Sequence, residues 1–259
     1  MVFRSSIRFL LFLQCVVVLA SGCATTEKTH SLTDKERAAF MAQVAAGSIN
    51  EGDPTGALGT LLEAERLDPQ SAYIKHLTAL AYFYKNDSDT ALTYAKKAVE
   101  LDPNFTEANN TLGKLLVDSG AYAQAERYLE RAAKDPLYRE TYKPRTNLGI
   151  LHYKRGEFAQ AEIHLNKAIQ DNPAAACVAY YYLGQVNLEK SKFSDAIENF
   201  DRATRKACGS YEEAHLALGI AYLRAKQFER ARKKFVEVQT AFPDTTIAKK
   251  AMDQLRYLP

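Results

Sequence analysis

Cysteine is the residue type in this chain most capable of covalent chemistry, and Cys177 and Cys208 form its most informative pair. Their positions predict that one lies at the start of a helix and the other just after the next helix. Because consecutive helices of a hairpin run antiparallel, these two ends lie on the same side. In an oxidising compartment this arrangement favours a disulfide, with two separate buried thiols as the alternative. No histidine accompanies the pair at ligand spacing, which disfavours a zinc site.

The five histidines show no pattern typical of catalysis or metal binding. None lies at the spacing of a metal site or a catalytic triad, and no glycine-rich phosphate loop follows a strand, since no strand is predicted. The sequence therefore predicts a protein that is not an enzyme and that holds no metal or cofactor. The histidines are His30, His76, His152, His164 and His215.

The charge balance is close to neutral, with 34 basic and 31 acidic residues. Nucleic-acid binding needs a basic stripe or patch. Local clusters such as Lys233-Lys234 are interpreted as solvated helix faces. The charge pattern therefore argues against nucleic acid as a partner.

Small residues recur with a period of about 35 residues along the chain. A Leu-Gly pair is followed twelve residues later by alanine and, seven residues after that, by another small or short apolar residue. This spacing is typical of the tetratricopeptide repeat, a helix–turn–helix unit of about 34 residues. The three sets are Gly113, Gly149, Gly184 and Gly219, then Ala125, Ala161, Ala196 and Ala231, then Ala132, Ala168, Ala203 and Val238.

The predicted fold is an all-α, right-handed superhelical solenoid of about six repeats. One helical hairpin cannot bury its apolar face alone, so neighbouring hairpins must stack. Residues 36–259 form the predicted repeat domain. The repeats are expected near 38–71, 72–105, 106–139, 142–175, 177–210 and 212–245.

Proline and glycine mark the expected helix ends. X-Pro pairs such as Leu-Asp-Pro at 67–69 end the second helices, because proline lacks an amide donor and displaces its predecessor from the helical region. Gly52, Gly120 and Gly156 are expected in the left-handed conformation at turns within repeats. We expect the glycine of each Leu-Gly pair to face the small alanine of the second helix. Large residues such as Phe200 and Phe235 are expected to fill the space between repeats.

The first 22 residues are typical of a secretory signal. Arg4 and Arg8 precede an apolar run over 9–20, which is too short to span a membrane. The following Ala20-Ser21-Gly22-Cys23 resembles the lipobox of bacterial lipoproteins, although alanine stands where leucine is usual. The resemblance implies cleavage before Cys23 and a diacylglycerol on its thiol. An ordinary signal peptide that leaves an incidental cysteine is the alternative.

Residues 23–35 are then expected to form a lipidated, polar, flexible tether. Two or more acyl chains anchor a protein stably, at about 0.8 kcal/mol per buried methylene. Lipoproteins retained at the inner membrane of enteric bacteria often carry aspartate after the lipidated cysteine. Ala24 therefore favours the outer membrane, with the protein on its periplasmic face.

The concave face of such a solenoid is its expected binding surface. Six positions on the first helix of each repeat project into it, and here they mix aromatic residues with amides. Aromatic side chains supply contact area at low entropic cost, and asparagines can bond an extended peptide. Packing against the neighbouring repeat is the alternative for each residue. The candidate groove residues are Tyr73, His76, Leu80, Phe83, Tyr84, Asn110, Lys114, Asn147, Ile150, Tyr153, Tyr181 and Gln185.

More specific residues lie around the third and fourth repeats, at Ala108-Asn109-Asn110, Gly120-Ala121-Tyr122, 133–138 and Asn147-Leu148-Gly149. With the lipobox and six repeats, they resemble the type IV pilus biogenesis and stability lipoproteins, the PilF/PilW/Tgl family of secretin pilotins. The resemblance implies a non-enzymatic factor that binds secretin subunits and promotes their assembly in the outer membrane. The alternative is a repeat lipoprotein that serves β-barrel assembly or recruits peptidoglycan enzymes.

Overall fold

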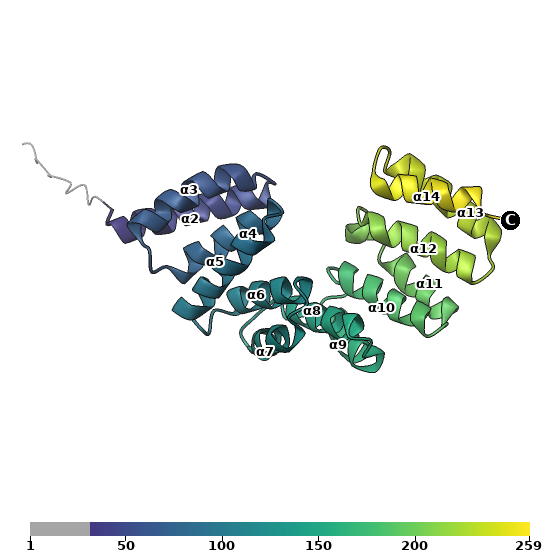
Figure 1. Ribbon diagram of the computed structural model, residues 1–259, viewed down its shortest axis with the longest axis horizontal. Helices are drawn as coiled ribbons and strands as arrows, with labels where there is room; N and C mark the ends of the chain where they lie inside the picture. Colours follow the sequence, from purple (N-terminus) through teal and green to yellow (C-terminus); the bar gives the residue numbers. More distant parts are fainter. Residues whose placement is uncertain (1–31) are drawn as a thin grey trace, which may run out of the picture. The chain divides into compact units, whose positions relative to one another are not determined.

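The computed structural model describes residues 32–259, which form thirteen α-helices, one short 3₁₀-helix and no strand (Figure 1). The predicted signal peptide, Cys23 and most of the predicted tether lie outside the described residues. The elements are α2 (Asp34–Asn50), α3 (Pro54–Leu67), α4 (Ala72–Tyr84), α5 (Ser88–Leu101), α6 (Thr106–Asp118), α7 (Tyr122–Ala133), α8 (Tyr142–Lys154), α9 (Phe158–Asp171), α10 (Cys177–Glu189), α11 (Phe193–Arg202), η1 (Lys206–Cys208), α12 (Glu212–Arg224), α13 (Phe228–Ala241) and α14 (Thr246–Arg256).

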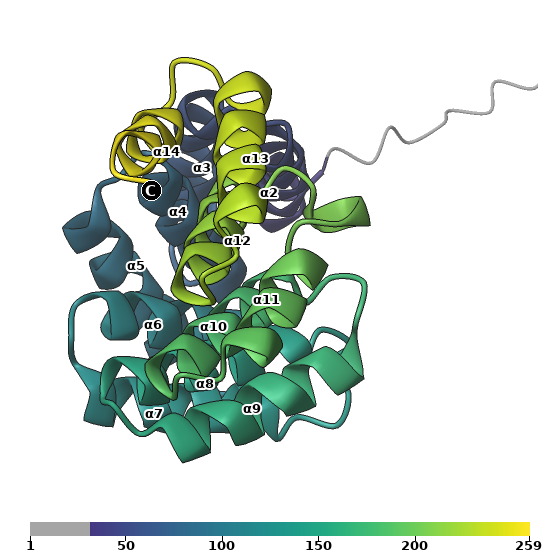
Figure 2. The same ribbon diagram turned by 90° about the vertical axis from the view of Figure 1, so that its right-hand side faces the viewer.

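Residues 34–259 form one compact unit of stacked helical hairpins (Figures 1 and 2). The hairpins pair α2 with α3, and so on in chain order to α12 with α13. Each second helix also contacts the first helix of the next hairpin, and the first helices from α2 to α10 contact one another in turn. The prediction of an all-helical repeat solenoid is therefore confirmed.

Five of the six hairpins begin at the residue where the sequence places a repeat, but the first does not. Its helix α2 begins at Asp34, inside the segment predicted to be a flexible tether, rather than near residue 38. Asp34 and Lys35, the last two residues of the predicted tether, are therefore helical. Asp34 and Glu36 lie in the first helical turn, where negative charge is favoured by the helix dipole.

The turns within the hairpins all place one residue in the left-handed region. Gly52, Gly120 and Gly156 have φ of +84°, +80° and +75°, as the sequence predicts. In the second, fifth and sixth hairpins Asn86, Ser191 and Lys226 take this conformation, with φ of 61°, 57° and 59°. The turn geometry is thus kept where the sequence lacks glycine. The four second helices followed by an X-Pro pair end at Leu67, Leu101, Asp171 and Ala241.

The Leu-Gly pairs pack differently from the prediction. A Cβ built on Gly113 would lie 2.5 Å from side-chain atoms of Leu129, and one on Gly184 would lie 2.7 Å from the ring of Phe200. The glycine therefore accepts a large residue four positions after the expected alanine. The same contact pairs Gly149 with Leu165 and Gly219 with Phe235. Phe200 shares a buried cluster with residues of α12, in the next hairpin, as expected of a residue between repeats. Phe200 and Phe235 also lie against the glycine of their own hairpin, which the sequence analysis did not predict.

A last helix, α14, follows the six hairpins and packs on α12 and α13. The sequence assigned no element to this segment. Thr245 caps the helix by accepting a hydrogen bond from the amide of Ala248 at 3.1 Å. Ile247, Ala248 and Ala251 are buried against the last hairpin. A solenoid needs such a terminal cover, because its last repeat otherwise exposes an apolar face.

The longest helix of residues 32–259 is α2, with 17 residues. Within this part of the chain, no helix combines the length and the apolar character that crossing a bilayer requires.

Candidate protein-binding groove

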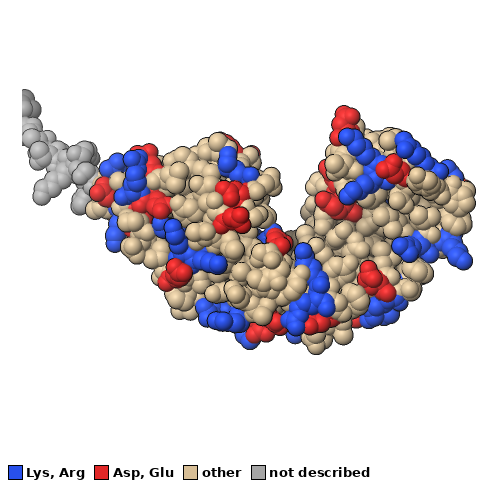
Figure 3. Space-filling model, viewed as in Figure 1, with Lys and Arg blue, Asp and Glu red and all other residues tan. Residues whose placement is uncertain are grey.

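The predicted groove residues lie on the first helices of the second to fifth hairpins. Figure 3 shows that residues 34–259 are hollowed on one side, and Figure 1 shows α6, α8 and α10 bordering this hollow. Eleven of the twelve predicted side chains are half-buried or exposed, as a contact surface requires. The exception is His76.

His76 is buried, with 6 % of its surface exposed, so it is removed from the candidate groove. Its ring packs edge-on against Phe105, with 5.1 Å between the ring centroids. Its Nδ1 atom has no hydrogen-bond partner within the described residues. Burial lowers the pKa of His76 from 6.5 to about 4, so the ring is neutral at physiological pH.

The N-terminal half of the groove combines exposed rings with one cation. Tyr73 and Tyr84 are 41 % and 56 % exposed, whereas Leu80 and Phe83 are half-buried. The ammonium of Lys114 lies 4.0 Å from the centroid of the Phe83 ring. The same ammonium donates to Asp118 Oδ2 at 2.8 Å. The cation in this half is therefore already covered by groups of this chain.

The middle of the groove carries a pair of amides from neighbouring hairpins. Asn147 Nδ2 on α8 donates to Asn110 Oδ1 on α6 at 2.9 Å. This bond uses the amino group of one side chain and the carbonyl of the other. The amino group of Asn110 and the carbonyl of Asn147 are left to bind a peptide backbone. Ile150, half-buried one turn further along α8, packs against the core beneath them.

The C-terminal half of the groove holds four tyrosines in contact. The ring centroids of Tyr153 and Tyr182 are 5.5 Å apart, those of Tyr181 and Tyr182 are 5.2 Å apart, and those of Tyr181 and Tyr211 are 5.2 Å apart. These rings come from α8, α10 and the residue before α12. Gln185 on α10 hydrogen-bonds to the Tyr181 side chain. The prediction named Tyr153, Tyr181 and Gln185.

Tyr211 was missed because it precedes α12 and so lies outside the helix positions that normally face the groove. Tyr182 stands at such a position and was left out of the candidate set. Its contacts with Tyr153 and Tyr181 come from two hairpins and depend on how these stack. The sequence signal for Tyr182 is the run of three consecutive tyrosines, Tyr180, Tyr181 and Tyr182, in α10.

Three carboxylates act electrostatically on this tyrosine cluster. Burial, together with the nearby Tyr181, Asp118, Tyr153 and Glu213, raises the pKa of Tyr182 to about 12. Burial also raises the pKa of Tyr153, with an added effect of the Glu189 carboxylate. Negative charges from α6, α10 and α12 therefore act on the same phenol groups. All four phenols are protonated at neutral pH and can donate hydrogen bonds.

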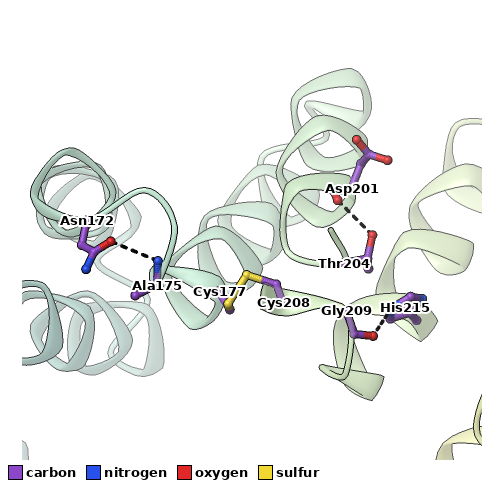
Figure 4. The surroundings of a disulfide bond; sticks show 8 residues. All are labelled: Asn172, Ala175, Cys177, Asp201, Thr204, Cys208, Gly209 and His215. Atoms are coloured by element: carbon purple, nitrogen blue, oxygen red, sulfur yellow. Dashed lines mark hydrogen bonds between the residues drawn. A yellow bond between two sulfur atoms is a disulfide. The ribbon is translucent and has the colours of Figure 1, made fainter. Parts of the chain in front are cut away.

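A disulfide joins Cys177, one turn before Tyr181 on α10, to Cys208, three residues before Tyr211 (Figure 4). Its Cα atoms are 5.4 Å apart, and it ties the first residue of α10 to the end of η1. The predicted pair is thus bonded in the structure. Next to it, His215 Nε2 donates to the Gly209 carbonyl at 2.9 Å. Both contacts hold the chain at Cys208 and Gly209, just before Tyr211.

A separate hollow of about 580 Å³ lies next to the disulfide, and Arg202 and Arg205 are among the residues that line it. Arg202 pairs with Glu198 at 2.9 Å and Arg205 pairs with Asp201 at 2.5 Å, so their charges are locally balanced. Within residues 32–259, no cluster of three or more potential ligand side chains could hold a metal ion.

One curated relative is the type IV pilus assembly protein PilF of Pseudomonas aeruginosa, which is 27 % identical to the chain over 151 residues. The aligned part is 58 % of this chain and 60 % of that relative. The match therefore spans less than two thirds of PilF.

Two solved structures have a similar fold. PilW, a widely conserved type IV pilus biogenesis factor, matches with a TM-score of 0.73 at 21 % identity, covering 83 % of this chain and 98 % of PilW. The Pseudomonas aeruginosa PilF structure matches with a TM-score of 0.68 at 18 % identity, covering 85 % of this chain and 99 % of PilF. At these identities the likeness shows the fold.

A family model for the tetratricopeptide repeat matches residues 110–176 and 181–244, about half of the chain. A second model with the same description matches residues 82–136. The matched segments include hairpins with left-handed turns and a glycine packed against a large residue of the second helix. The chain belongs to the tetratricopeptide-repeat family.

Proposed function

We propose that this chain is a non-enzymatic scaffold of type IV pilus biogenesis, a lipoprotein at the periplasmic face of the outer membrane that binds secretin subunits and promotes their assembly. The observation that carries the proposal is the sequence similarity to PilF, a type IV pilus assembly protein. The fold shared with PilW and PilF is consistent with a role in type IV pilus biogenesis.

The groove supports a role in protein binding. It offers half-buried rings, the free amide groups of Asn110 and Asn147, and phenol donors along one face of four successive hairpins. Such a surface suits an extended segment of a partner, because amides bond the backbone and rings pack on alternate side chains. A secretin segment is the partner that the proposal assigns to it.

The N-terminal sequence supports attachment to a membrane. Acylation at Cys23 would hold the repeat unit near the lipid surface, where secretin subunits insert. Tethering raises the effective concentration of the groove for a partner at the same membrane. In this proposal the lipid concentrates the scaffold and the groove selects the partner.

The test is a strain that lacks the gene, complemented with the wild type, Cys23→Ala or Cys15→Ala. We expect the deletion to lose heat-resistant secretin multimers from outer-membrane fractions, as seen on denaturing gels. Cys23→Ala should restore them poorly or in the wrong fraction, because the acyl chains are missing. Cys15→Ala is the matched control, since that cysteine lies in the predicted signal and not at the predicted lipid site.

Normal secretin multimers and normal pili in the deletion strain would contradict the proposal. Full complementation by Cys23→Ala would contradict the role of the anchor alone. Metabolic labelling with a radioactive fatty acid tests the acylation directly, since label in the Cys15→Ala protein but not in the Cys23→Ala protein is expected.

A further inference from the structure

Aromatic rings elsewhere in this protein are covered by its own cations. Lys75 and Lys97 lie within 5.7 Å and 5.1 Å of the centroid of the Tyr94 ring. In the same way, Lys114 lies over Phe83, Arg202 over Tyr180 and Arg230 over Tyr222. These contacts show that the chain supplies a Lys or Arg to four buried or half-buried rings.

The tyrosine cluster of the groove is different. Among the described residues, no Lys or Arg makes such a contact with the rings of Tyr153, Tyr181, Tyr182 or Tyr211. The four rings nevertheless form one connected group with centroids 5.2 to 5.5 Å apart. All four side chains keep part of their surface exposed. Helices α8 and α10, which carry three of them, border the hollow of residues 34–259 (Figures 1 and 3).

The carboxylates around this cluster are also incompletely paired. Asp118 is bonded to Lys114, whose ammonium also covers Phe83. Glu189 and Glu213 are exposed, and neither takes part in an ion pair between described residues. Their charges act on the phenols of Tyr153 and Tyr182. The site therefore combines uncovered aromatic faces with two carboxylates, Glu189 and Glu213, that have no counter-ion among the described residues.

We propose that Tyr153, Tyr181, Tyr182 and Tyr211, with Glu189 and Glu213, form a subsite for an arginine or lysine side chain of the segment bound in the groove. The inference rests on the proposed function only in that a protein segment occupies the groove. A cation over an aromatic face gains about 0.5–2 kcal/mol, more where water is excluded. The carboxylates add attraction and oppose an acidic side chain at the same place.

The geometry favours a basic side chain over an apolar one. An apolar side chain over the rings would bring apolar surface toward the two carboxylates without neutralising them, whereas a guanidinium can stack on a ring and hydrogen-bond to a carboxylate. The aliphatic stem of arginine or lysine would pack on the half-buried rings while its charge remains at the groove surface. The partner segment is thus expected to carry a basic residue at the position that meets α10.

The experiment measures binding of two fluorescein-labelled probe peptides to the full chain purified in detergent. One probe is Ala-Leu-Ala-Arg-Ala-Leu-Ala-amide, and the other has citrulline, a neutral isostere, in place of arginine. Fluorescence anisotropy should show about tenfold tighter binding of the arginine peptide, within the range of cation–π energies. Raising the salt concentration should reduce this difference, because the carboxylates are exposed.

Two variants test whether the preference for the arginine peptide arises at the subsite. Tyr182→Leu removes the central ring, and Glu213→Gln removes one charge without touching an ion pair of the described residues. Both should bring the arginine peptide to within about threefold of the citrulline peptide. The matched controls are Tyr257→Leu and Glu229→Gln. Tyr257 carries an 85 % exposed ring outside the groove. Glu229 is the second residue of α13, as Glu213 is the second residue of α12. Both controls should keep the wild-type preference.

Equal binding of the two peptides, or no binding of either, overturns the subsite. A preference for arginine that survives in both Tyr182→Leu and Glu213→Gln overturns it as well. Circular dichroism of each variant separates loss of the subsite from loss of the fold. If the preference holds while secretin multimers form normally in the deletion strain, the subsite stands and the pilus proposal fails. If the deletion abolishes multimers but the probes bind alike, only the subsite is rejected.

Discussion

At the scale of single residues, four glycines decide how closely the two helices of a hairpin approach. Gly113, Gly149, Gly184 and Gly219 each face a large, fully buried side chain of the second helix. Gly59 on α3 is also a helical glycine, but a Cβ built on it would have no atom within 4 Å. The same substitution at these two kinds of position therefore has opposite physical consequences.

Gly184→Ala is expected to destabilise the protein by about 1–3 kcal/mol, because the added methyl would overlap the ring of Phe200 in a packed core. Gly59→Ala is expected to stabilise it by up to about 1 kcal/mol, since alanine has the higher helix propensity and open space is available. Urea unfolding followed by circular dichroism measures both. Effects of the same sign would contradict the packing argument.

The burial of His76 predicts that the protein loses stability in acid. Its pKa is lowered by burial to about 4 in the folded protein, against 6.5 when exposed, so the unfolded chain binds the proton more tightly. The contribution of neutral His76 to the free energy of unfolding is fully present above about pH 6.5. It is lost as the pH falls, and the loss reaches about 3 kcal/mol at pH 4. His76→Leu should remove this part of the pH dependence. An unchanged difference in unfolding free energy between pH 7 and pH 4.5 in the variant would contradict it.

At the scale of elements, the fifth hairpin differs from the others in how its second helix ends. Helix α11 has 10 residues, whereas α9 and α13 have 14. No X-Pro pair follows it, and the chain continues through η1 with Lys206 at a φ of 54°. The disulfide holds this irregular segment to α10 and thereby supports Tyr211 at the groove.

Loss of the disulfide is expected to destabilise the protein by about 3–4 kcal/mol, since it closes a loop across 31 positions. The double variant Cys177→Ser/Cys208→Ser and the reduced wild type should show the same lower urea midpoint. Adding reductant to the double variant is the control and should change nothing. A wild-type midpoint in the double variant would show that packing alone holds the loop.

At the scale of the whole described unit, stability is a sum of contacts between neighbouring hairpins. Four buried clusters follow one another along residues 34–259, each shared by adjacent hairpins. The last cluster includes Ile247 and Ala251 from α14. Local damage should therefore weaken one end of the solenoid before it affects the other.

Removal of residues 246–259 should expose the apolar face of the last hairpin and speed amide hydrogen exchange in α12 and α13. Amides of α4 and α5 serve as the internal control, because these helices form the second hairpin and pack against α2, α3 and α6. Exchange that accelerates equally along the whole chain would indicate one cooperative unit instead of nearest-neighbour coupling.

Much of the fold follows from local sequence rules. The Leu-Gly and alanine spacing, the prolines after helices and the turn glycines each act within one hairpin, so their consequences are readable from a single repeat. The start of α2 and the presence of α14 could not be predicted from the sequence, because the repeat pattern weakens at the two ends of the array. There, helix formation depends on the first-turn acids of α2 and on the buried face of α14.

The candidate groove was predictable only in part. Helix periodicity placed Tyr153, Tyr181 and Asn147 on the inner face, since that face is set by position within a repeat. It also placed His76 there, but Phe105 from the next hairpin covers that ring. Whether a side chain at such a position remains open depends on its neighbour across the hairpin boundary.

The sequence by itself determined that this protein is a helical repeat solenoid, because spacing within about 34 residues specifies each hairpin and stacking follows from the exposed apolar face. Only the tertiary structure decided that Tyr211 and Glu213 join the tyrosines of α8 and α10. It also decided which rings are covered by a cation of the chain and which are not. These contacts join residues of different hairpins, and their geometry depends on how the hairpins stack.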